Sequence, residues 1–218
     1  MNRIQLICEG ERDARITMAL IDRCLELRGL EPQAHRAWCR DGPNAFWTPQ
    51  SLGNRLGPKR RAPVLRRKKA LDVVALKAFL CQPDADLVLL LVDTDRGEPF
   101  SDWAREKAEE NPQRWILANA SPKIEAWGLY LSRQDATFRA AGVELKRRIG
   151  IDPVQHPHRT TPGRSIKEAK QVFEHDLGLT TDEVERLIAS APPDLLGAPD
   201  SVGLHDLWVQ LDGWVASL

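Results

Sequence analysis

The sequence lacks the features that mark several classes of protein. No apolar run approaches the roughly 20 residues of a membrane span, so we expect no membrane contact. Strand-like sequence begins by Ile4 and leaves no room for a signal peptide. The four cysteines have neither C-x-x-C spacing nor a nearby histidine at zinc-site spacing, which predicts reduced thiols in a cytoplasmic protein. No phosphate-binding loop of the P-loop type is present, so any ATPase is expected to be a separate partner.

Net charge is also absent, but the charges are unevenly distributed. The 31 basic residues equal the 31 acidic residues. From residue 171 to the end, however, Arg186 is the only cation against nine acids. The rest of the chain therefore has a surplus of positive charge. Such asymmetry is typical of a polyanion-binding body, or of two patches that meet across a homodimer.

The apolar pattern predicts an α/β fold. Strands are predicted at residues 3–8, 33–39, 87–92 and 114–117. Helices are predicted from the first strand to Gly29, and at 66–80, 99–110, 121–131, 135–149, 165–176, 181–189 and 204–215. We expect a small, mostly parallel sheet flanked by helices, with an all-helical C-terminal part. The α/β domain is predicted at 1–131, with a basic loop inserted at 40–69. Residues 132–218 either pack on it or form a small subdomain.

Acidic residues follow three of the predicted strands. Glu9 comes directly after the first strand, Asp93 and Asp95 follow the third, and Glu125 lies shortly beyond the fourth. Parallel strands end at one edge of a sheet, which is where open α/β sheets place their ligands. In extended chain, positions i and i+2 point the same way, so Asp93 and Asp95 can reach one cation. Oxygen ligands of this kind favour Mg²⁺ or Mn²⁺, whereas the plain alternative is a solvated acidic turn.

The order of these motifs resembles the TOPRIM fold. That fold is shared by topoisomerases, bacterial-type primases, recombination proteins and OLD-family nucleases. The segment Pro122-Lys123-Ile124-Glu125-Ala126-Trp127-Gly128-Leu129 is similar to one in small bacterial TOPRIM-like proteins, including the RloB-like group associated with phage defence. Gly128 stands where such segments more often carry a leucine. The resemblance implies Glu9 as the acid/base glutamate, with Glu9, Asp93 and Asp95 as metal ligands. It also implies a catalytic part for Glu125, the glutamate of the third segment.

Three functions are compatible with these residues. The first is a metal-dependent phosphodiesterase, a DNA or RNA nuclease of a bacterial anti-phage defence system. The second is a non-catalytic nucleic-acid-binding or regulatory subunit, docked through its acidic helical C-terminus on an ATPase or another defence protein. The third is an enzyme that acts on a small phosphorylated substrate, with the basic loop as a lid.

A basic segment at residues 55–69 carries eight cations and no acid. These cations, the expected nucleic-acid contacts, are Arg55, Lys59, Arg60, Arg61, Arg66, Arg67, Lys68 and Lys69. Together with the nearby Phe46 and Trp47, they could grip a phosphate backbone and stack an exposed base. The plain alternative is a solvated flexible loop before a helix.

Charge reversal at Arg66 and Arg67 tests this role. If the segment binds phosphates, the double variant should bind nucleic acid more weakly and with a shallower dependence on salt concentration, because fewer counterions are released. Titration of a labelled oligonucleotide at several salt concentrations measures both quantities. Unchanged affinity would exclude the segment from nucleic-acid binding.

Overall fold

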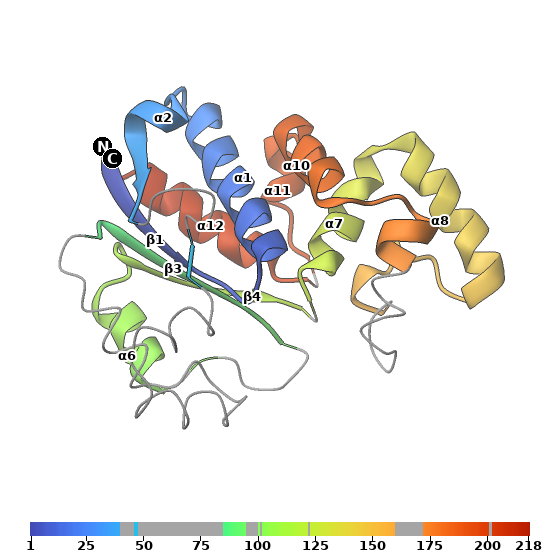
Figure 1. Ribbon diagram of the computed structural model, residues 1–218, viewed down its shortest axis with the longest axis horizontal. Coiled ribbons are helices and arrows are strands. Elements are labelled where there is room, and N and C mark those ends of the chain that lie inside the picture. Colours follow the sequence, from blue (N-terminus) through green and yellow to red (C-terminus); the bar gives the residue numbers. More distant parts are fainter. Residues whose placement is uncertain are drawn as a thin grey trace.

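The computed structural model describes residues 1–39, 46–47, 85–94, 100, 102–121, 123–159, 172–200 and 202–218. In these residues the strands β1 (Asn2–Ile7), β2 (Arg36–Trp38), β3 (Leu87–Asp93) and β4 (Trp115–Ala120) form one sheet. The strand order is β2-β1-β3-β4 and every pairing is parallel (Figure 1). The predicted α/β fold with a helical C-terminal part is thus confirmed.

The interior strand β3 has no polar residue before Asp93, so it presents apolar side chains to both faces of the sheet. On β3, Leu89 and Leu91 pack into the larger core with α1 (Glu11–Leu27), α7 (Glu125–Leu131), α10 (Thr181–Ser190) and α12 (Leu204–Val215). Val88 and Leu90 pack on the opposite face, in a smaller core with α6 (Asp102–Glu110). Continuous apolar sequence is what a parallel strand covered on both faces requires. Figure 1 shows α1, α10 and α12 above the sheet and α6 below it.

The remaining described elements are short, apart from one helix. They are α2 (Pro32–His35), the 3₁₀ turns η1 (Ser132–Gln134) and η2 (Pro157–Arg159), the helix α8 (Ala136–Ile149), the π-helical turn η3 (Val172–Asp176) and α11 (Pro193–Leu196). The helices predicted at 135–149, 181–189 and 204–215 are confirmed. The helix predicted at 66–80 and most of the loop at 40–69 lie outside the described residues, as does 165–171 of the helix predicted at 165–176.

Three predicted boundaries were wrong, one because of a proline and two because of contacts between distant parts of the chain. Residues 33–35 are helical rather than extended, since Pro32 occupies the first position of α2. The fourth strand continues to Ala120, where its carbonyl accepts from the Thr94 N–H at 3.0 Å. The following helix begins at Glu125 and not at Ser121, because the Ser121 N–H instead donates to the carbonyl of Val202 at 2.9 Å.

The charge asymmetry of the sequence is partly balanced within the chain. Arg15 of α1 pairs with Asp182 and Glu185 of α10, both at 2.5 Å, and Arg28 pairs with Asp212 of α12 at 2.7 Å. Acids of the C-terminal part therefore face a basic residue of α1 and the arginine that follows this helix. These pairs are largely exposed, so they contribute little to stability.

Gly128 provides the close packing between α7 and the C-terminal part. A Cβ at this position would lie 2.8 Å from Phe173 Cε2 and 2.8 Å from Val184 Cγ2. Phe173 and Val184 are both fully buried. A leucine at position 128 would collide with both side chains. The absence of a side chain at Gly128 therefore allows Phe173 and Val184 to pack directly on α7.

A second glycine, Gly203, lets the chain approach the outer edge of β4. Its φ is +82°, in the left-handed region. A Cβ there would lie 2.1 Å from the carbonyl oxygen of Asn119. The preceding carbonyl, of Val202, accepts from the Trp127 indole at 2.6 Å. Residues 202–203 therefore join β4 and α7 at the start of α12.

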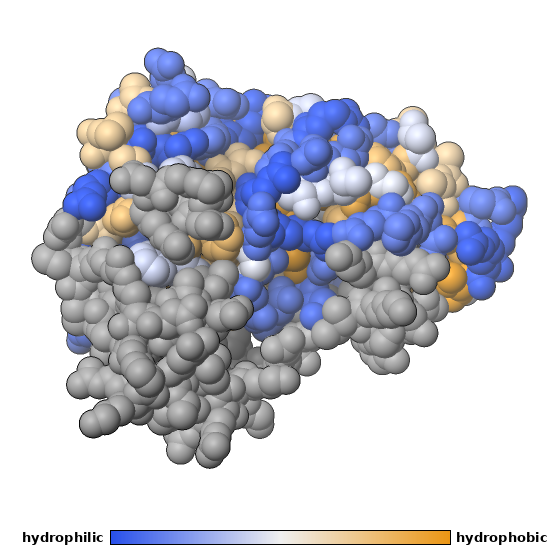
Figure 2. Space-filling view, in the orientation of Figure 1, coloured by the Kyte–Doolittle hydropathy of each residue, from blue (hydrophilic) through white to orange (hydrophobic). Residues whose placement is uncertain are grey.

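The described surface is mostly polar on the face drawn in Figure 2, with small apolar patches between hydrophilic ones. Among the described residues, no helix has both the length and the apolar character that crossing a membrane requires.

Replacing Gly203 with alanine should lower the free energy of unfolding by about 1–3 kcal/mol from backbone strain alone, and by more through the contact with Asn119. The matched control is Gly213→Ala on the same helix, where a Cβ meets nothing within 4 Å. That change should be neutral or stabilising by up to about 1 kcal/mol. Urea denaturation compares the two variants. Equal stability of Gly203→Ala and the wild type would contradict the described approach to β4.

Candidate functional site

The turn between β1 and α1 holds two carboxylates. Glu9 is exposed, and its Oε1 lies 3.4 Å from the backbone nitrogen of Asp93. Asp13 lies in the first turn of α1 and accepts from the Gly10 N–H at 2.9 Å. This hydrogen bond closes the start of the helix. Glu9 reaches across to the end of β3, while Asp13 is held by the turn.

Asp93 is the last residue of β3, and its carboxylate is largely buried. One oxygen accepts from the Ile124 N–H at 3.1 Å, and the other lies 3.7 Å from Lys123 Nζ. The side chains of Asp93 and Lys123 are 14% and 13% exposed. Parallel pairing places Asp93 beside Ala120, the last residue of β4. The segment after β4 therefore passes directly over the Asp93 carboxylate.

Glu125 begins α7 and is bound to Arg12. The guanidinium of Arg12 lies 2.8 Å from Glu125 Oε1 and also pairs with Glu174 of η3. It stands over the Phe173 ring, 5.3 Å from the ring centroid. Arg12 thus joins the β1–α1 turn, α7 and the C-terminal part. The predicted catalytic residue Glu125 is close to Asp93 in the fold, but its charge is already compensated.

Several carboxylates act on Asp93 together. Burial, with the added effect of the charges of Asp13, Glu9 and Glu125, raises the pKa of Asp93 from its ordinary 3.8 to about 8. Lys123 acts in the opposite direction without cancelling these effects. Glu9, Asp93 and Glu125, which were expected to meet at one edge, are thus close enough to influence one titration. A strongly shifted carboxyl beside specific charged partners is characteristic of functional sites.

Asp13 and Cys8 are affected by the same surroundings. Burial raises the pKa of Asp13 to about 6, the Gly10 N–H lowers it, and Glu125 and Glu9 raise it. Burial and then Asp13 raise the pKa of the Cys8 thiol, whose sulfur donates to the Gly10 carbonyl at 3.3 Å. Cys8 is therefore a buried residue whose thiol favours the protonated form.

The described carboxylates supply a small number of candidate metal ligands. No group of three or more His, Cys, Asp or Glu side chains suited to a metal ion occurs in the part of the chain that the structure describes. Asp95, the third expected ligand, lies outside it. Glu9 and Asp93 remain as a neighbouring pair. Since Mg²⁺ commonly uses one or two protein carboxylates and keeps several waters, this pair suits that ion or Mn²⁺.

The predicted nucleic-acid contacts, all at residues 55–69, also lie outside the described residues. The two aromatic residues expected to stack a base are described. Phe46 and Trp47 are only 6% and 5% exposed, and Trp47 pairs with the end of β1 through hydrogen bonds to Cys8 and Leu6. A base-stacking role for this pair was therefore a wrong prediction, because both rings are buried in the cores beside the sheet.

The sequence motifs assign no role to three residues of the site, Lys123, Arg12 and Asp13. Asp13 accepts from the Gly10 N–H and so also belongs to the start of α1. The contacts of Arg12 with Glu125 and Glu174 span 113 and 162 positions. No local pattern signals partners at such separations.

Comparisons of the chain with protein-family models, with curated proteins and with solved structures found no match. The interpretation of the site therefore rests on its own residues.

The raised pKa of Asp93 predicts how the stability of the metal-free protein depends on pH. The folded chain keeps this proton up to about pH 8, whereas the unfolded chain releases it near 3.8. Raising the pH through this window should lower the free energy of unfolding, by up to about 1.4 kcal/mol per pH unit for one proton. Asp93→Asn should flatten the curve of unfolding free energy against pH, because asparagine does not titrate. The asparagine oxygen can still accept from the Ile124 N–H, which keeps this contact in the variant.

Chemical denaturation in EDTA at several pH values between about 5 and 8 measures this slope. Asp194→Asn, at an exposed aspartate of α11, is the control and should keep the wild-type slope. Parallel curves for the wild type and Asp93→Asn would contradict the described environment of Asp93.

Proposed function

We propose that this protein is a metal-dependent phosphodiesterase, a nuclease of TOPRIM type. The observation that carries the proposal is the position of Asp93. Its nearly buried carboxylate lies among Glu9, Asp13 and Glu125 and has Lys123 as its paired cation at 3.7 Å. Concentrating like charge at one sheet edge is unfavourable for the chain alone. A divalent cation would relieve it, which makes cation binding the natural use of this edge.

Each residue has a distinct part in the proposed mechanism. Glu9 and Asp93 would hold Mg²⁺ or Mn²⁺, with Asp95 as a further ligand by its place in the D-x-D motif. When bound, the cation supplies charge stabilisation at a phosphoryl oxygen. Glu9, exposed at the end of β1, takes or delivers the proton. Lys123 keeps a positive charge beside Asp93, and Arg12 fixes Glu125 at the start of α7.

The composition of residues 55–69 favours nucleic acid over a small phosphorylated substrate. Eight cations without an acid suit a long polyanion. The resemblance of the motifs to small TOPRIM-like proteins supports a role for the nuclease in a cytoplasmic, bacterial anti-phage system. An ATPase or another defence protein would then be its partner.

One observation favours a second candidate, a nucleic-acid-binding subunit without catalysis. Glu125 is tied to Arg12, so one of the four proposed catalytic carboxylates is already neutralised. In this alternative the acidic C-terminal part would dock a partner. Three of its acids are less suited to docking than their sequence suggests, because Arg15 and Arg28 pair with them: Asp182, Glu185 and Asp212.

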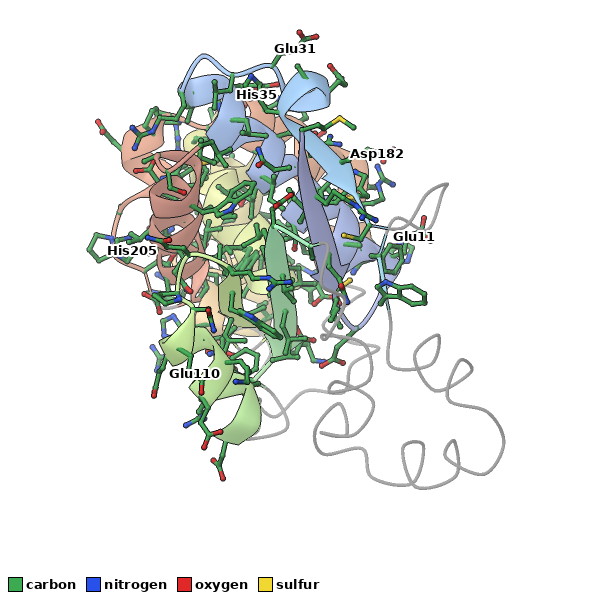
Figure 3. All side chains as sticks on the ribbon, turned by 90° about the vertical axis from the view of Figure 1, so that its left-hand side faces the viewer. Glu11, Glu31, His35, Glu110, Asp182 and His205 are labelled. Carbon is green, nitrogen blue, oxygen red and sulfur yellow. The ribbon has the colours of Figure 1, made fainter. Side chains whose placement is uncertain are left out.

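Nuclease activity should depend on Asp93 and Glu9. Asp93→Asn and Glu9→Gln should each lower the rate of phosphodiester cleavage at least about 100-fold in Mg²⁺ or Mn²⁺, because each removes a ligand or proton-transfer group. The matched control is Glu11→Gln. Glu11 is an exposed glutamate two positions along, labelled in Figure 3, and that variant should keep wild-type activity.

Cleavage of labelled single- and double-stranded DNA and RNA measures the effect, with thermal denaturation to show that each variant folds. Metal-dependent cleavage that persists in a folded Asp93→Asn variant would contradict the proposed catalytic site. Equal nucleic-acid binding by all variants without any cleavage would favour the binding subunit.

A further inference from the structure

The ammonium group of Lys123 lies at the carboxylate that the proposed cation would use. Its Nζ is 3.7 Å from Asp93 Oδ2, and both side chains are largely buried. A buried ammonium is costly unless a counter-charge stays beside it, and the same holds for a buried carboxylate. The pair therefore differs from the exposed ion pairs of this chain, such as Arg15 with Asp182.

The two carboxylate oxygens of Asp93 have different surroundings. Oδ1 accepts from the Ile124 N–H at 3.1 Å. Oδ2 accepts no hydrogen bond from the residues that the structure describes, because Lys123 Nζ at 3.7 Å is beyond hydrogen-bond distance. The contact of Oδ2 with Lys123 is thus one of charge alone. Oδ2 is the oxygen that remains for a cation.

Backbone contacts hold the segment on which Lys123 lies. The Lys123 carbonyl accepts from the Ala126 N–H at 2.9 Å, and the next N–H, of Ile124, donates to Asp93. The lysine side chain, in contrast, carries its charge on a flexible four-carbon stem. The ammonium can therefore move away from Oδ2 while the segment keeps its place over Asp93.

A divalent cation and the Lys123 ammonium compete for the same oxygen. Mg²⁺ binds oxygen at about 2.1 Å, so on Asp93 Oδ2 it would lie at most about 6 Å from Nζ where the ammonium now stands. Charges of +2 and +1 repel strongly at this separation in a largely buried site. The side chain that neutralises Asp93 in the metal-free chain is thus the one that opposes a cation there.

We propose that Lys123 is a resident counter-cation, which holds the cation position at Asp93 until a divalent ion displaces it. Its charge sets the affinity of the edge for Mn²⁺ and Mg²⁺ below the value that Glu9 and Asp93 alone would give. Lys123 acts through Asp93 and is not a catalytic residue. The inference rests on the proposed cation site but not on phosphodiester cleavage.

Calorimetric titration of the metal-depleted full chain with Mn²⁺, at one fixed pH, tests this role. Lys123→Met keeps an unbranched stem and removes the charge, so it should bind Mn²⁺ at least about tenfold more tightly than the wild type. Lys123→Arg keeps the charge and should stay within about threefold of the wild type. The matched control is Lys146→Met, at an exposed lysine of α8, which lies beyond α7 from the sheet in Figure 1. It should bind as the wild type does.

The trivalent ion Tb³⁺ separates repulsion from a change of packing. Repulsion by an ammonium grows with the charge of the ion, so the gain in affinity of Lys123→Met should be larger for Tb³⁺ than for Mn²⁺. A gain that came from altered packing would not grow with the charge of the ion. Equal gains for the two ions would therefore contradict displacement of a charge.

Equal Mn²⁺ affinity of the wild type and Lys123→Met, with both shown to be folded by thermal denaturation, would overturn the proposal. Absence of Mn²⁺ binding by both proteins would overturn it together with the cation site. Tighter binding by Lys123→Met, in a protein that cleaves no nucleic acid, would support the inference and contradict the nuclease. Equal affinity in a protein that does cleave would contradict the inference alone.

Discussion

Parallel pairing of β1 with β3 and of β3 with β4 is the constraint on which the rest of the site depends. It ends all three strands at one edge and so brings Glu9, Asp93 and the segment before Glu125 together. Burial raises the pKa of Asp93 well above its ordinary value, and repulsion from the neighbouring carboxylates adds to this effect. Lys123 and Arg12 are the cations that the fold places against this charge. Neither cation brings the pKa of Asp93 back to its ordinary value.

The helical C-terminal part also belongs to this arrangement. Arg12 leaves the first turn of α1 and contacts both Glu125 of α7 and Glu174 of η3. Gly128 lets Phe173 and Val184 pack on α7, and Gly203 brings the start of α12 against β4. The C-terminal part, which lies far beyond the site edge in the sequence, therefore supports that edge through packing and an ion pair. A movement of Glu174 in the C-terminal part should therefore shift Arg12 and, through it, the position of Glu125.

The sequence predicted what a local pattern can determine. Continuous apolar runs give β1 and β3, and the carboxylates that follow them must share an edge once the strands are parallel. Partners distant in sequence were beyond such reasoning. Arg12 carries no sign of its bonds to Glu125 and Glu174, and buried Trp47 looks in sequence like any aromatic residue beside a basic loop.

The central claim is that the carboxylates at this edge bind a divalent cation. Calorimetric titration of the folded protein with Mn²⁺ and Mg²⁺ tests it most directly, with the Asp93→Ala/Asp95→Ala double variant for comparison. The account predicts saturable binding by the wild type that the double variant loses while remaining folded. Absence of binding by the folded wild type, or unchanged binding by the variant, would contradict it.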